Sequence, residues 1–182
     1  MIRKIGTVIG HLLDDALHIE AQGQVAEGDF VIISGHRVTV GKICCEKSGD
    51  TLSVGPGDRF CLPVNFNPDL IPEGTDVWFV GRQGEEILPA GVVSHLFVKI
   101  EVLAVQVFEE LRPGMKVFLN DLGPFEISSL QVNHETREVV LPRENCGLKL
   151  EDLDFSQAKE GAKIFVVSED GEPAEVEETV TV

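Results

Sequence analysis

Apolar and polar residues alternate along much of the chain with the period of two that is typical of β-strands. Short runs rich in β-branched or aromatic residues lie between Gly-Asp, Ser-Gly and Pro-Gly turn signals, at residues 30–33, 36–44, 76–80, 116–119 and 125–132. Residues 100–108 contain Leu and Ala, which suit a helix, but their valines and their period of two favour a strand. At most one helical turn is predicted, near residues 152–158. The pattern therefore predicts an all-β fold.

The two halves of the chain match each other. Residues 6–12 align with residues 90–96, which places His11 on His95. Further along the chain, Gly28 falls on Gly114, Cys61 on Cys146 and Gly74 on Gly161. The offset drifts only from 84 (His95 minus His11) to 87 (Gly161 minus Gly74), as one small insertion per loop would produce. The chain is therefore predicted to contain two copies of one small domain, related by an internal duplication.

The repeat predicts a first β-barrel at residues 1–84, a second at residues 87–168 and an acidic C-terminal tail at residues 169–182. We expect each copy to close into a six-stranded antiparallel barrel, because closure removes the exposed edges of short strands. The tail carries six Asp and Glu residues and no Lys or Arg, so it is expected to leave the second barrel.

Four stretches of the second copy carry a resemblance to a known family: residues 91–102 with their Gly-x-Val opening, 111–117, 127–135 and 146–150. Together they resemble the β-barrel second domain of translational GTPases of the elongation-factor class, over most of residues 88–168. Met115 stands where that family has Asp after the turn glycine, whereas the first copy keeps Gly28-Asp29. The resemblance implies tandem translation-factor-type barrels.

In that family the barrel docks on ribosomal RNA or cradles the end of an aminoacyl-tRNA. The sequence contains no Gly-x-x-x-x-Gly-Lys-Ser/Thr phosphate loop, so we expect no GTPase domain within these residues. The resemblance therefore implies a binding scaffold without implying hydrolysis.

The charge balance narrows the choice of partner. Lys and Arg number 15 and Asp and Glu 31, which gives a net charge of −16. This charge disfavours non-specific nucleic acid and anionic membranes, because both attract proteins through a positive field. No apolar run approaches the roughly 20 residues of a membrane span. We expect a cytoplasmic protein whose four cysteines are reduced.

Few residues are candidates for a site, and each also has a structural interpretation. His11 and His95 are possible partner contacts or structural histidines, and Phe66 is a plausible contact in the long loop at residues 65–72. Cys61 and Cys146 are expected in the core. The turn at residues 55–58 resembles a phosphate-binding loop but is expected to be a plain tight turn. The basic residues are expected to form a solvated face, and they are Arg3, Lys4, Arg37, Lys42 and Lys47.

No catalytic triad, metal-ligand cluster or dinucleotide fingerprint is present in the sequence. We therefore expect no catalytic residue, cofactor or metal, and a non-catalytic binding module that contacts a protein partner or structured RNA such as the ribosome. The alternative is an accessory subunit or detached domain that positions a catalytic partner enzyme. A free-standing hydrolase or oxidoreductase comes third.

Overall fold

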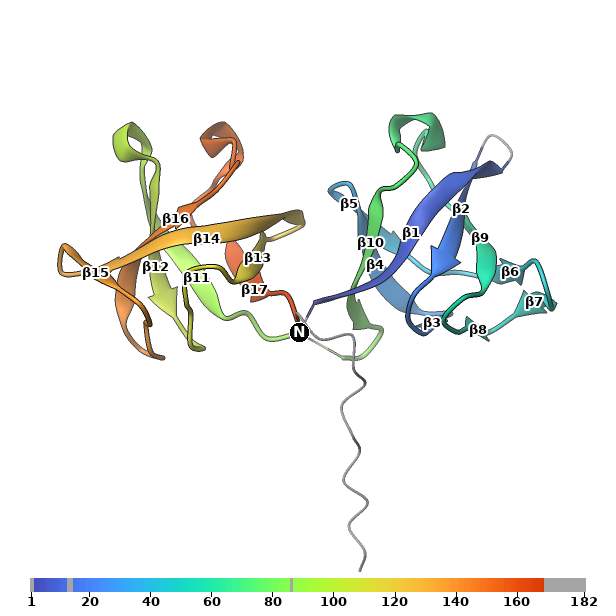
Figure 1. Cartoon of the computed structure of the whole chain (residues 1–182), viewed down its shortest axis with the longest axis horizontal. Coiled ribbons are helices and arrows are strands. Elements are labelled where there is room, and N and C mark those ends of the chain that lie inside the picture. Colours follow the sequence, from blue (N-terminus) through green and yellow to red (C-terminus); the bar gives the residue numbers. More distant parts are fainter. Residues whose placement is uncertain (1, 13–14, 86, 169–182) are drawn as a thin grey trace, which may run out of the picture.

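The computed structural model describes residues 2–12, 15–85 and 87–168, and these form two antiparallel β-sheet domains side by side (Figure 1). The acidic tail at residues 169–182 lies outside the described residues. Helical structure in the described part is limited to three 3-10 turns, η1 (Pro68–Leu70), η2 (Val98–Ile100) and η3 (Phe155–Gln157). The all-β prediction is confirmed, and η3 is the turn expected near residues 152–158, whereas η1 and η2 are turns that the sequence did not predict. None of the described helices is long and apolar enough to cross a membrane.

The second domain is a closed barrel. Its strands are β11 (Gly91–Phe97), β12 (Val102–Val107), β13 (Lys116–Leu119), β14 (Leu122–Val132), β15 (Glu135–Arg137), β16 (Asn145–Leu150) and β17 (Lys163–Val166). They pair in the order β13-β17-β11-β12-β16-β14-β15, and β13 also pairs with β14. That additional pairing closes a ring of six strands, as predicted.

The first domain has the same strand order but an open sheet. Its strands are β1 (Arg3–Leu12), β2 (Ala16–Ala21), β4 (Asp29–Ile33), β5 (His36–Thr39), β6 (Ile43–Cys45), β7 (Gly49–Thr51), β9 (Arg59–Pro63) and β10 (Asp76–Arg82). They pair in the order β5-β4-β10-β1-β2-β9-β6-β7, and a small separate sheet joins β3 (Val25–Ala26) to β8 (Ser53–Val54). The prediction of a second closed barrel is not confirmed, because this domain is a curled eight-stranded sheet.

The difference lies in one strand. In the second domain β14 is continuous, and it pairs with β13 near its start and with β16 further along. The corresponding stretch of the first domain forms two separate strands, β5 and β6. The prediction of one strand over residues 36–44 is therefore wrong. β5 pairs only with β4, and β6 pairs with β9 and β7.

A serine and a glycine account for the break. The buried positions lie three residues apart in both domains, at Val40 and Ile43 and at Ile127 and Leu130, so the alternation must change phase between them. In β14 the register shifts at this point, and the Ser128 hydroxyl donates a hydrogen bond to the Lys149 carbonyl of β16 at 3.1 Å. The first domain has Gly41 in that place, which offers no side chain to bridge the gap.

The backbone hydrogen bonds correct the alignment of the repeat. The Val8 amide donates to the Thr75 carbonyl, and the Val93 amide donates to the Ala162 carbonyl in the same way. Val8 therefore corresponds to Val93, and His95 corresponds to Gly10 rather than to His11. The predicted placement of His11 on His95 is wrong by one residue, because the prediction matched the two histidines as identical residues.

Gly28 and Gly114 do correspond. Both have a positive φ, of 88° and 85°, and their amides donate at 2.8 Å to the equivalent carbonyls of Val40 and Ile127. An L-residue would be strained at either position. Met115 and Asp29 both accept a hydrogen bond from the backbone amide three residues earlier. The acceptor is the sulfur of Met115, at 3.1 Å, and the carboxylate of Asp29, at 2.8 Å.

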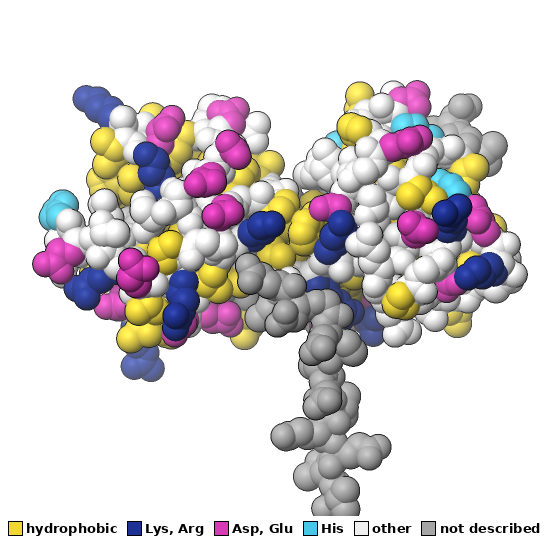
Figure 2. All heavy atoms as spheres, in the orientation of Figure 1, with side chains coloured by type: hydrophobic (Ala, Val, Ile, Leu, Met, Phe, Trp, Pro, Cys, Tyr) yellow, Lys and Arg dark blue, Asp and Glu magenta, His cyan; other side chains and the backbone are white. Residues whose placement is uncertain are grey.

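Each domain has its own hydrophobic core, and a third buried cluster joins the two domains. This cluster, the seam, consists of Ile2, Ile32, Val80, Phe118 and Val167. Hydrophobic side chains are visible where the two lobes of the molecule meet (Figure 2).

Backbone and side-chain contacts support the seam. Ile2 pairs with Val167 as a parallel bridge, so the start of the first domain is bonded to the end of the second. The ring of Trp78 meets that of Phe118 edge-on at 5.6 Å between centroids. Arg37 and Asp121 form an exposed ion pair across the two domains at 3.2 Å. The domains therefore form one body, held mainly by apolar contact.

We predict that Phe118→Ala lowers the free energy of unfolding by about 3 kcal/mol, because the substitution removes a fully buried aromatic ring. Phe108→Ala is the matched control, since Phe108 is exposed, and it is expected to cost less than about 1 kcal/mol. Urea denaturation followed by circular dichroism measures both values. Equal losses for the two variants would contradict a seam built on Phe118.

Candidate binding pocket on the second barrel

An exposed apolar tip stands between β11 and β12. Here the chain makes the 3-10 turn η2 and then passes through Glu101 in the left-handed conformation, with φ 53°. The turn interrupts strand alternation and leaves the side chains of Phe97, Val98 and Ile100 exposed to solvent, with Val98 at 66% and Ile100 at 62%. Water-exposed apolar side chains in a group, rather than singly, are typical of binding surfaces.

The tip borders a pocket of about 370 Å³ on the outside of the barrel. Its lining residues come from the end of β11, from η2, β12, β14 and β16 and from the turn after β14: Phe97, Ile100, Val102, Ala104, Gln131, Asn133, His134, Asn145, Cys146 and Gly147. Gly147 helps to create the space, because a Cβ there would lie 3.1 Å from a Val102 methyl group. The lining combines apolar walls with the side-chain amides of Gln131, Asn133 and Asn145.

The lining includes one thiol, that of Cys146. Burial, followed by the nearby Glu144 carboxylate, raises the pKa of the Cys146 thiol to about 11, so the thiol is protonated at neutral pH. A protonated thiol is a poor nucleophile. In the described part of the chain, no group of three or more His, Cys, Asp or Glu side chains is arranged to hold a metal ion.

One of the three predicted contact residues lies beside the pocket. The His95 ring meets the Phe97 ring at 4.9 Å, edge-on, and its Nδ1 lies 2.7 Å from a Glu160 carboxylate oxygen. The Glu160 contact fixes the imidazole, which in turn supports Phe97 at the rim.

The other two predicted contact residues lie in the first domain, away from the pocket. His11 Nε2 is 2.7 Å from the Ile71 carbonyl, so its ring joins the end of β1 to the segment after η1. Phe66 is half-buried and stacks on His36 at 4.3 Å. Both side chains therefore have structural partners within their own domain.

The residues that sequence reasoning missed are Val98, Ile100 and the amide-bearing Gln131 and Asn133. Ile100 was assigned to the following strand, although β12 begins only at Val102. The signal was present in the run Phe97-Val98-Lys99-Ile100, which places three apolar residues where one strand ends.

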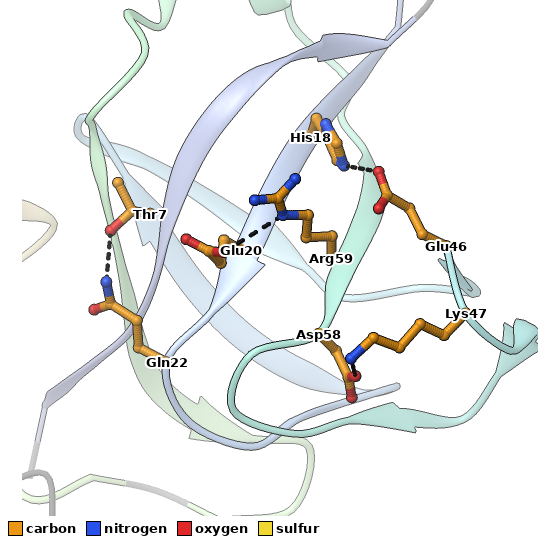
Figure 3. A network of polar contacts seen from close by, with 8 residues as sticks. All are labelled: Thr7, His18, Glu20, Gln22, Glu46, Lys47, Asp58 and Arg59. Carbon is orange, nitrogen blue, oxygen red and sulfur yellow. Dashed lines mark hydrogen bonds and ion pairs between the residues drawn. The ribbon is translucent and has the colours of Figure 1, made fainter.

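The basic residues of the first domain do not form a free cationic patch. Ion pairs join Lys4 to Asp76, Lys42 to Asp50, Lys47 to Asp58 and Arg37 to Asp121. The Arg3 guanidinium lies over the Phe79 ring at 5.0 Å. Figure 3 shows the Lys47–Asp58 pair with other polar contacts on the outside of this domain. Lys4, Arg37, Lys42 and Lys47 are exposed as expected for solvated residues, whereas Arg3 is half-buried.

The Gly-Pro-Gly-Asp turn is also self-contained. The Asp58 carboxylate accepts a hydrogen bond from the Gly55 amide at 2.9 Å, which would be one of the donors to a bound phosphate. That backbone hydrogen bond, assisted by Lys47, lowers the pKa of Asp58. An occupied donor beside a carboxylate does not attract an anion, so the plain-turn interpretation holds.

A larger cavity of about 510 Å³ lies at the seam, and its lining includes an ion pair between the two domains. Arg37 and Asp121 line it and neutralise each other. The pocket on the second barrel is therefore the better candidate for binding a partner.

A scan against protein-family models found no match, and no curated protein matches the sequence.

We predict that iodoacetamide at pH 8 labels the exposed Cys44 in the folded protein but leaves Cys146 unlabelled until the chain is unfolded. The reason is that the pKa of Cys146, at about 11, leaves little thiolate at pH 8, and burial blocks the reagent. Peptide mass spectrometry measures labelling at each site. Equal labelling of the two thiols in the folded state would contradict the buried, protonated Cys146.

Proposed function

We propose that the chain is a non-catalytic binding module in which the pocket of the second barrel holds an apolar side chain of a protein partner. The observation that carries this proposal is the exposed group Phe97, Val98 and Ile100 beside an apolar pocket with amide groups in its lining. An apolar group at the centre with hydrogen-bonding groups around it is the usual anatomy of a protein interface.

The energetic case rests on burial. Each large apolar side chain that a partner covers contributes about 1.5–3 kcal/mol relative to exposure. Three such side chains supply a strong local anchor, and binding energy in interfaces is concentrated in small groups of this kind. The side-chain amides of Gln131, Asn133 and Asn145 add direction through hydrogen bonds to backbone groups of the partner.

Charge favours a protein over RNA. The chain carries a net charge of −16, and four of its basic side chains in the first domain and at the seam are already ion-paired. A phosphate backbone would be repelled at long range, whereas a basic protein surface would be attracted. The partner is therefore a protein with basic residues around an apolar side chain. The translation-factor resemblance of the second barrel makes structured RNA the competing outcome of the test.

The seam favours a second version of this proposal. Because apolar contacts fix the two domains to each other, a partner bound to the second barrel is held at a defined position relative to the first. An accessory subunit that positions a catalytic enzyme needs this property. In that version the protein partner is itself an enzyme.

We predict that Ile100→Asp abolishes partner capture, because it places a charge at the centre of the apolar contact. The control is Leu52→Asp, which introduces the same charge at a side chain that is 73% exposed on the other domain. Tagged wild-type and variant chains are used to capture proteins from a lysate of cells that carry the gene, with and without ribonuclease. The captured protein is then titrated against each variant by calorimetry.

The proposal requires a protein whose affinity falls at least tenfold, about 1.4 kcal/mol, with Ile100→Asp and remains unchanged with Leu52→Asp. Binding that survives Ile100→Asp would remove the pocket from the account. Capture that disappears with ribonuclease, and whose affinity falls linearly with log salt, would identify an RNA partner instead.

A further inference from the structure

A row of reactive side chains crosses the outside of the first domain. His18 on β2 lies opposite Cys61 on β9, and Cys61 lies opposite Cys44 on β6. Residues directly opposite each other in an antiparallel sheet project from the same face. The adjacent Cys45 points the other way, into the core, as expected for a strand. The two thiols of Cys44 and Cys61 are therefore neighbours on one surface.

The sequence alignment of the two copies placed Cys61 on Cys146 and therefore gave no sign of this pair. Because Val105 pairs with Cys146 as Ile19 pairs with Phe60, the counterpart of the buried Cys146 is Phe60. Cys61 occupies the next position and is only half-buried, so the prediction that it lies in the core is wrong.

The backbone spacing suits a disulfide. The Glu46 amide donates to the Arg59 carbonyl at 2.9 Å, which makes that pair a hydrogen-bonded one. Hydrogen-bonded pairs recur every second residue, so Cys44 and Cys61 form the next such pair, with Cα atoms about 5.5 Å apart. Disulfides span Cα separations of about 4.4–6.8 Å. The Cβ atoms of an opposed pair lie about 1 Å further apart than the separation that a disulfide prefers. The bond therefore forms under slight strain and is easily reduced.

We propose that Cys44 and Cys61 are a thiol modification site that forms a reversible cross-strand disulfide by reaction with a low-molecular-weight disulfide such as oxidised glutathione.

The surroundings assign the two thiols different roles. Cys44 is exposed, so an oxidant reaches it first. Burial, then Cys44 and Glu46, raise the pKa of Cys61. Cys44 is therefore the attacking thiol and Cys61 the resolving thiol.

The polar groups over Cys61 complete the site. The His18 Nε2 lies 2.7 Å from a Glu46 carboxylate oxygen, and Figure 3 shows this contact between His18 on β2 and Glu46 in the turn after β6. Since Cys61 lies on β9 opposite His18, the imidazole lies beside the thiol on the same face of the sheet.

The reaction balances in two exchanges. The Cys44 thiolate attacks one sulfur of oxidised glutathione, which forms a mixed disulfide and releases one glutathione thiolate. The Cys61 sulfur, after losing its proton, attacks Cys44 Sγ and releases the second glutathione thiolate. Both leaving thiolates take up protons, so two protein thiols are oxidised and one glutathione disulfide is reduced to two thiols.

The bond would join β6 to β9 in the part of the sheet where β6 and β5 are separated by the break at Gly41. A covalent link there replaces part of the support that the closed barrel obtains from the continuous β14. We therefore expect the oxidised protein to have a higher melting temperature than the reduced protein.

The full chain is incubated with oxidised glutathione and analysed intact and after digestion, without reduction, by mass spectrometry. We expect the loss of two hydrogens, a peptide linked through Cys44 and Cys61, and complete reversal by dithiothreitol. Cys61→Ser should stop the reaction at a stable glutathione adduct on Cys44. The double variant C45S/C146S, the matched control, should form the link as the wild type does.

A stable glutathione adduct on Cys44 of the wild-type chain, without the link, would overturn the proposal, because it would show that Cys61 cannot resolve it. A link through Cys45 or Cys146 would overturn it equally. Because the wild type itself carries the decisive result, the experiment does not depend on how well any variant folds.

Discussion

The apolar seam between the domains is the contact on which the rest of the structure depends. Ile2 and Val167, from opposite ends of the described chain, pair there as a parallel bridge, and Phe118 of the second domain packs into the same cluster. Without this cluster the chain would consist of two small sheet domains, each with its own core, joined only by the segment that links them. With it, the domain that carries the pocket and the domain that carries the thiol pair are in direct apolar contact. Apolar burial dominates here because the exposed Arg37–Asp121 ion pair across the domains is worth at most about 1 kcal/mol.

The two copies of the repeated domain differ in structure and in the role that we propose for each. The second domain closes into a barrel and carries the exposed apolar tip at η2. The first keeps an open sheet, because Gly41 stands where Ser128 bonds to the neighbouring strand, and its outer face carries paired charges and the opposed Cys44 and Cys61. We therefore assign partner binding to the closed copy and redox modification to the open one, so that each can change without disturbing the other.

The sequence predicted the architecture better than the site. Period-two alternation predicted the strands, and the repeat predicted a shared strand order, because both depend on apolar positions that burial enforces. The alignment failed by one residue at His95 and Cys146, because it matched identical residues, His11 with His95 and Cys61 with Cys146, whose positions on the paired strands differ by one. The exposed Ile100 is included in the predicted strand at residues 100–108, since an apolar run looks the same whether it is buried or projects from a turn. The opposition of Cys44 and Cys61 depends on the pairing of β6 with β9, which no local pattern contains.

The central claim is that the two domains form one rigid module. Residual dipolar couplings of the backbone amides, measured on the weakly aligned wild-type protein, test it most directly because they report the orientation of each domain independently. The account predicts that couplings from residues 3–82 and from residues 91–166 fit a single alignment tensor of the same magnitude and direction. Two tensors of clearly different magnitude would show that the domains move independently, and would contradict the seam as the basis of the structure.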